Sequence, residues 1–204
     1  MNRNLSVTGL IGGAATTLSG IAVEAVVKPA SDVSDKLWSY PWSAGALVPV
    51  SIAYAVLHLL VFAGMVAVYH AMPSRAGRIG AAIAGAGTLV LLVAELASIP
   101  IADQRIDDTG PQVVGALFGL GVALTAIGLL VAGIAVLPRW TGWQRCTALV
   151  AGVWAVVMIV LSMTSALPLG VAIYGVTLCV LFAAVLTHGT QATPDPRIHA
   201  RVER

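Results

Sequence analysis

The chain has 204 residues, of which 58% are hydrophobic and only 10% are charged, and its formal net charge is +2. A water-soluble domain needs more charge to cover its surface, so this composition excludes one and makes the lipid bilayer the expected surroundings. The small net charge is scattered and gives no basis for a nucleic-acid partner. Cys146 and Cys179 have neither metal-ligand nor CxxC spacing, so no metal site and no other cofactor is expected.

Six apolar stretches follow one another along the chain. A membrane core about 30 Å thick requires roughly 20 apolar residues per helix. The predicted spans are residues 5–27, 46–69, 79–101, 113–137, 147–167 and 169–186. The sequence therefore predicts an all-α, polytopic protein of the cell membrane, with six transmembrane helices in one bundle over residues 1–188. The polar residues 189–204 are expected to form a disordered tail.

The basic residues predict the orientation of this bundle. If the N-terminus lies inside, the outer side carries only Lys28, Lys36 and Arg105, and the other eight of the eleven basic residues lie inside. Because basic residues concentrate in cytoplasmic segments, both termini are expected in the cytoplasm.

Glycines recur at helical spacing in the first and fourth spans. Gly9 with Gly13, and Gly115 with Gly119, form GxxxG steps, which let helices approach closely in a bilayer. Close helix packing is therefore expected at all four positions. The length of the first span and its glycines also disfavour the alternative that it is a cleaved signal peptide.

Two carboxylates, Glu24 and Glu95, fall within the first and third predicted spans. An ionisable group in hydrocarbon is costly unless it faces the bundle interior, so both are candidate catalytic residues. Counted from the inner ends of their helices, their depths agree within roughly 5 Å, which predicts one shared cavity. The alternatives are a helical Glu24–Lys28 ion pair and a structural interhelical hydrogen bond for Glu95.

His58, near the middle of the second span, is the third candidate catalytic residue, and a structural hydrogen bond is its alternative. Aromatic residues are expected beside it and at the cavity that holds Glu24 and Glu95. Trp38 and Trp42 in the first outer loop, Tyr54 beside His58, and Tyr174 in the sixth span are candidate substrate-binding residues. Aromatic faces stabilise cations, so acids beneath aromatics suit carbocation chemistry on a lipid-like substrate. An interfacial aromatic belt is the alternative for the two tryptophans.

The outer loops carry two acidic groups, Asp32 with Asp35, and Asp103 with Asp107 and Asp108. Paired acidic clusters can hold Mg²⁺ against a diphosphate, which defines a magnesium-dependent prenyl-diphosphate enzyme as one alternative function. Solvation of exposed loops explains the same residues without a metal.

Two membrane-edge segments, Leu137-Pro-Arg-Trp-Thr-Gly142 and Ala76-Gly-Arg-Ile-Gly80, resemble those of small bacterial multi-pass membrane proteins. In size, helix count and intramembrane acids, the chain also resembles the membrane-bound terpene cyclases of meroterpenoid and indole-terpenoid pathways. That resemblance implies that acidic residues protonate an alkene or epoxide of a prenylated substrate. By position, Glu24 and Glu95 would take this role.

The expected function is thus proton-initiated cyclisation of a lipophilic, prenylated small molecule by intramembrane carboxylic acids, without a cofactor. A proton-coupled small-solute transporter would also place Glu and His inside the bundle, and would be expected to form a homo-oligomer. A non-catalytic membrane subunit would need Glu24 and Glu95 only for assembly.

Overall fold

The computed structural model describes residues 3–191, with side chains to residue 188. Within this part the chain forms helices and no strand, and six of the helices are long and apolar enough to cross a membrane. They are α1 (Arg3–Ala22), α2 (Ala44–Ala71), α3 (Arg75–Ser98), α4 (Thr109–Val136), α5 (Thr147–Leu161) and α6 (Leu167–Gln191). Short helical turns extend three of them: Val23–Val27 after α1, Ile99–Ile101 after α3, and Gly142–Cys146 before α5. The predicted six-helix, multi-pass architecture is confirmed.

The last two helices meet at a different place from the one predicted. The sequence predicts a turn at Pro168, whereas α5 ends at Leu161 and α6 already begins at Leu167. Proline is well tolerated in the first turn of a helix, because the backbone N–H that it lacks has no intrahelical partner there. Pro168 therefore helps to start α6. At its other end α6 continues to Gln191, and residues 192–204 of the predicted tail lie outside the described residues.

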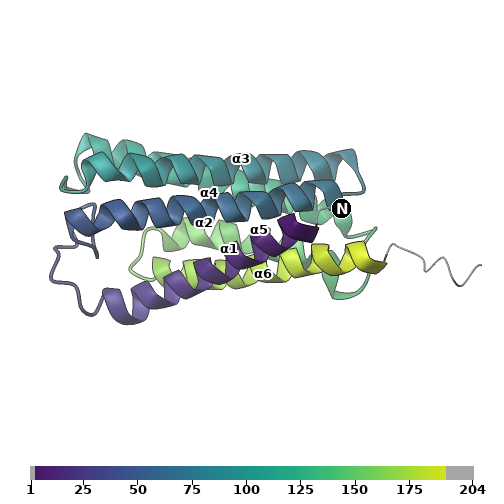
Figure 1. Cartoon of the computed structure of the whole chain (residues 1–204). Coiled ribbons are helices and arrows are strands. Elements are labelled where there is room, and N and C mark those ends of the chain that lie inside the picture. Colours follow the sequence, from purple (N-terminus) through teal and green to yellow (C-terminus); the bar gives the residue numbers. More distant parts are fainter. Residues whose placement is uncertain (1–2, 192–204) are drawn as a thin grey trace, which may run out of the picture.

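The helices form an antiparallel ring in chain order. Each one packs against the next, and α6 closes the ring by packing along α1. The start of α1 and the end of α6 lie at the same end of the bundle (Figure 1). Their placement on the cytoplasmic side remains a prediction from the basic residues.

Close glycine contacts hold neighbouring helices together. A Cβ atom on Gly9 of α1 would lie 2.6 Å from the Cα atom of Gly64 in α2, and one on Gly80 of α3 would lie 2.6 Å from the backbone nitrogen of Ala132 in α4. Larger residues at these positions would force the helices apart. Such contacts add van der Waals packing where lipid provides no hydrophobic driving force.

The interior of the ring is filled only towards the end that holds the chain termini. There, large side chains from α2, α4 and α6 pack into one buried cluster that includes Met65, Leu129 and Phe182. We call this region the packed half. The opposite half, beneath the loops that join α1 to α2, α3 to α4, and α5 to α6, is the hollow half.

Candidate functional site

A cavity of about 590 Å³ occupies the hollow half. Its volume lies within the roughly 300–1,000 Å³ range of pockets that hold small molecules. All six helices contribute to its wall, as do two tryptophans of the first loop. The lining residues include Thr16, Ser19, Trp38, Trp42, Tyr54, Leu57, His58, Leu91, Glu95, Phe118, Gly119, Met158, Ser162, Leu167 and Tyr174. The wall is thus mainly apolar and aromatic, with a few polar groups.

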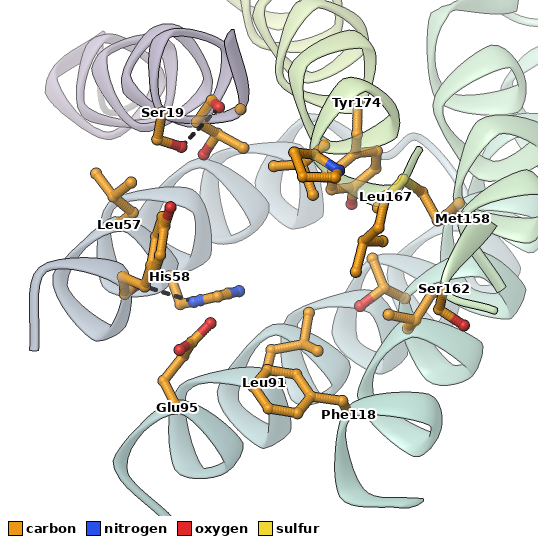
Figure 2. A pocket seen from close by; sticks show the side chains of 18 of the residues that line it. Ser19, Leu57, His58, Leu91, Glu95, Phe118, Met158, Ser162, Leu167 and Tyr174 are labelled. Carbon is orange, nitrogen blue, oxygen red and sulfur yellow. Dashed lines mark hydrogen bonds between the residues drawn. The ribbon is translucent and has the colours of Figure 1, made fainter. Parts of the chain in front are cut away.

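Glu95 of α3 provides the only carboxyl group among these lining residues. Its side chain extends from α3 into the cavity (Figure 2). Within residues 3–191, no hydrogen bond or salt bridge joins this carboxyl to another group, and no lysine or arginine lines the cavity. The carboxyl is therefore available to a molecule that enters the cavity.

His58 lies across from Glu95 on α2, and the Glu95 carboxyl points toward its ring (Figure 2). The Nδ1 atom of His58 is 2.8 Å from the carbonyl oxygen of Tyr54, one helical turn earlier. Because a carbonyl oxygen only accepts hydrogen bonds, Nδ1 must carry the proton in this contact. In the neutral ring, Nε2 then keeps its lone pair and can accept a proton or a hydrogen bond.

The four predicted substrate-binding aromatics, Trp38, Trp42, Tyr54 and Tyr174, all line the cavity. Backbone pairing between two loops positions Trp38. The Trp38 N–H donates to the Gln104 carbonyl at 2.9 Å, and next to this contact the Ile106 N–H donates to Lys36 at 3.0 Å. The Trp38 ring packs against Phe118 of α4, with ring centroids 6.3 Å apart. The first loop is thereby held over the hollow half.

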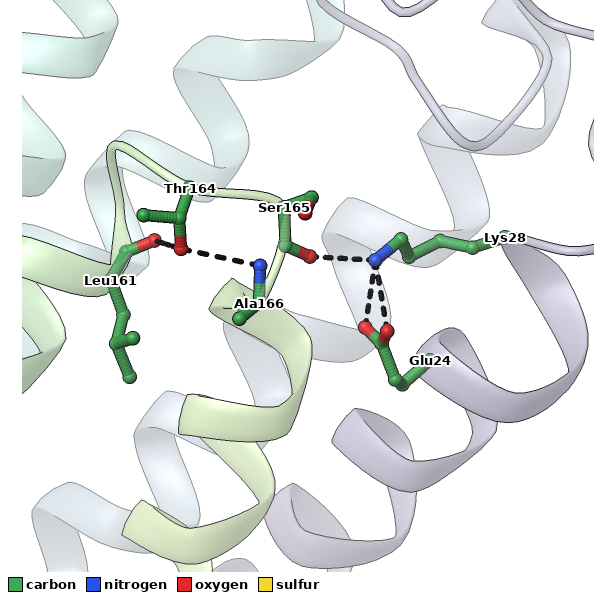
Figure 3. Close-up of polar contacts among 6 residues, drawn as sticks. All are labelled: Glu24, Lys28, Leu161, Thr164, Ser165 and Ala166. Atoms are coloured by element: carbon green, nitrogen blue, oxygen red, sulfur yellow. Dashed lines mark hydrogen bonds and ion pairs between the residues drawn. The ribbon is translucent and has the colours of Figure 1, made fainter.

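Glu24 does not line this cavity, so the predicted cavity shared by Glu24 and Glu95 is wrong. Both oxygens of the Glu24 carboxylate accept hydrogen bonds from the Lys28 ammonium group, at 2.8 and 3.0 Å. The same ammonium group donates to the Ser165 carbonyl at 2.6 Å, which ties the end of α1 to the turn between α5 and α6 (Figure 3). Glu24 and Glu95 were predicted at the same depth, but equal depth does not make two side chains face the same cavity. Lys28, four residues after Glu24, is the local partner that determines where the Glu24 side chain points.

Gly115 and Gly119 also differ from the prediction. Both line the cavity, and a Cβ atom on Gly119 would have no neighbour within 4 Å. On Gly115 it would only reach the edge of the Trp38 ring, at 4.0 Å. This GxxxG step therefore creates space for the cavity and does not bring helices together.

Serine and threonine hydroxyl groups of the wall have already used their hydrogens. Five lining side chains donate to backbone carbonyls of their own helix or turn, at 2.7–3.0 Å: Thr16 to Gly12, Ser19 to Thr16, Thr88 to Ala84, Thr125 to Gly121, and Ser162 to Ile159. The sequence analysis missed these residues, because serine and threonine are common in membrane helices as structural groups. Their oxygens present lone pairs, so this part of the wall mainly accepts hydrogen bonds.

The acidic residues of the loop between α3 and α4 lie outside the cavity. The Arg105 guanidinium group contacts the Asp107 carboxylate at 3.0 Å, and this hydrogen bond lowers the pKa of Asp107. Asp108 accepts a hydrogen bond from the Arg105 backbone N–H at 2.8 Å. Between residues 3 and 191, no three His, Cys, Asp or Glu side chains lie close enough together to hold a metal ion. Asp107 and Asp108 thus contribute to the structure of the loop.

Comparison of the chain with known protein families, with characterised proteins and with solved structures finds no match.

Proposed function

We propose that the protein is a membrane-bound cyclase that starts ring closure of a lipophilic, prenylated substrate by protonating it. The observation that carries this proposal is a single carboxyl group, Glu95, in an aromatic cavity with the His58 imidazole across from it. A prenylated substrate dissolved in the bilayer suits an apolar chamber inside a six-helix bundle. The aromatic wall would stabilise positive charge as it moves along the substrate.

In the proposed reaction, Glu95 as a carboxylic acid gives its proton to the terminal alkene or epoxide oxygen of the substrate. With an epoxide, one C–O bond breaks and the oxygen becomes a hydroxyl group. Electron pairs of the neighbouring double bonds then form the new C–C bonds, and the positive charge moves to the far end of the substrate. His58 Nε2 removes a proton next to the final cation, which leaves a double bond. Transfer of this proton from His58 to the Glu95 carboxylate restores the enzyme, so the overall change is an isomerisation.

A diphosphate substrate has less support in this cavity. Diphosphates are bound by cationic groups or by metal ions, and none of the described residues that line the cavity is a lysine or arginine. Of the acidic loop residues, Asp107 and Asp108 contact Arg105. The magnesium-dependent alternative would need its site outside the cavity.

A proton-coupled transporter is the second candidate, favoured by Glu95 and His58 facing each other inside the membrane-spanning ring. In that case the packed half would have to open during the transport cycle. The cluster around Phe182 would then change its packing while the cavity closes.

The test is conversion of a linear prenylated aromatic compound, and of its terminal epoxide, by membranes that contain the protein. Glu95→Gln keeps the size of the side chain but removes its transferable proton, so turnover should fall by about 10²–10⁴-fold. The matched variant Glu24→Gln lies outside the cavity and should retain activity within a few fold. In D₂O, the product of the alkene should gain one deuterium at the protonated carbon.

Three results would contradict the proposal. Parent-level turnover by Glu95→Gln would remove Glu95 as the proton donor. Complete loss of activity in EDTA, with inactive Asp32→Asn and Asp35→Asn variants, would support the diphosphate enzyme instead. If no prenylated substrate reacts but a proton gradient drives Glu95-dependent uptake of a solute, the protein is a transporter.

A further inference from the structure

An ionised Glu95 carboxylate would leave an unbalanced negative charge in the cavity. Glu95 is the single carboxyl of the wall, and no described lining residue is a lysine or arginine. The charged form of a carboxyl in apolar surroundings is costly unless an opposite charge compensates it. Apart from the His58 imidazole, which is uncharged as long as Nε2 keeps its lone pair, no described lining residue supplies that charge, so a cationic ligand can supply it.

The serine, threonine and histidine groups of the cavity wall favour a ligand that donates hydrogen bonds. The wall hydroxyls of Thr16, Ser19 and Thr88 direct their hydrogens to helix carbonyls, at 2.8–3.0 Å. The His58 Nδ1–H is bonded to Tyr54 in the same way, which leaves Nε2 as an acceptor. A ligand with N–H groups would therefore find several acceptors in the cavity that holds Glu95.

The aromatic side chains favour positive charge as well. Trp38, Trp42 and Phe118 line the same cavity, and the Trp38 and Phe118 rings pack against each other. The negative face of an aromatic ring attracts a cation, and tryptophan does so most strongly among the natural aromatic side chains. The Glu95 carboxylate, the hydrogen-bond acceptors and the aromatic faces thus all favour a positively charged ligand that carries N–H groups.

We infer that the cavity binds lipophilic ammonium compounds, that is, protonated amines attached to an apolar body. The ammonium N–H groups donate to Glu95 and to His58 Nε2, and the hydrocarbon part packs against the aromatic wall. This inference uses the cavity of the proposed function but not its reaction. If the protein binds the ammonium compound but cyclises no substrate, the inference holds and the proposed function is wrong.

The test uses three probes with the same geranyl chain and different head groups. They are geranylammonium, its uncharged analogue with CH₃ in place of the NH₃⁺ group, and geranyl sulfonate. Binding to the purified protein in nanodiscs of zwitterionic lipid is measured by calorimetry, with empty nanodiscs as the blank for partition into lipid. The ammonium probe should bind saturably and at least tenfold more tightly than either of the others.

Variants then locate the binding site. Glu95→Gln should weaken binding of the ammonium probe at least tenfold and leave the uncharged probe unchanged, whereas Glu24→Gln should change neither. Equal affinity for all three probes, no saturable binding, or unchanged ammonium binding by Glu95→Gln would overturn the inference. If Glu95→Gln fails to fold, the order of the three probes on the unaltered protein decides the question alone.

Discussion

The two halves of the bundle share one ring of six helices but differ in what fills its centre. In the packed half, Met65, Leu129 and Phe182 occupy the space between the helices and are almost completely buried. In the hollow half, glycines and hydroxyl residues take the places of such large side chains, and about 590 Å³ remains empty. The difference suggests that stability comes mainly from the packed half, which allows the hollow half to serve a ligand.

The largest effect on stability should come from Phe182→Ala in the packed half. The Phe182 ring fits against Gly9 and Gly64, and its loss should leave a cavity that costs about 3–5 kcal/mol. Phe118→Ala is the matched change in the hollow half. It should cost less than about 2 kcal/mol, because one side of that ring already faces empty space. Reversible unfolding in mixed micelles measures both losses, and equal values would contradict the division into two halves.

A smaller effect is expected from Trp38→Ala, which removes part of the aromatic wall. The loss of a cation–π contact of about 1–2 kcal/mol should reduce cyclisation roughly five- to thirtyfold. Water entering beside Phe118 should also increase the share of hydroxylated products, which mass spectrometry detects. Trp143→Ala is the control, because Trp143 is 57% exposed and does not line the cavity. A Trp38→Ala enzyme with parent rate and products would show that the loop does not serve as a wall.

The smallest effect should come from Lys28→Met, which breaks the link between α1 and the turn joining α5 to α6. The side chains of Lys28 and Glu24 are 16% and 38% exposed, so solvent screens their attraction, and the expected loss is about 0.5–1 kcal/mol. The turn should become more mobile, which faster hydrogen exchange at Ser165 and Ala166 would reveal. Unchanged exchange there would mean that the Lys28 contact does not hold the turn.

The sequence alone predicts the fold well, because six long apolar stretches in one chain allow little besides six membrane helices. It also predicts Glu95 and His58 as interior residues, since polar groups are costly in contact with lipid. It fails where the direction of a side chain matters. Gly119 and Gly121 look alike in the sequence, yet they point about 200° apart around α4, one into the cavity and one toward Leu91.

Local partners and contacts between loops limit the prediction in other places. The depth of Glu24 along its helix predicted that its carboxyl faces the cavity. Its position four residues before Lys28 instead made Lys28 its partner. The pairing of Trp38 with Gln104 joins two loops that are distant in sequence, and no pattern in either loop indicates it. Such contacts depend on how the helices pack, which composition and helical spacing do not specify.

Filling the hollow half with a side chain tests whether it is a chamber for a ligand. Gly119→Leu places a side chain in open space, so the protein should keep its thermal stability but lose both binding of the ammonium probe and cyclisation. Gly121→Leu, two residues later, should instead destabilise the fold, since its Cβ atom would lie 2.8 Å from the Leu91 side chain. A stable Gly119→Leu protein that still binds the probe and turns over substrate at the parent rate would show that the hollow half is not the ligand chamber.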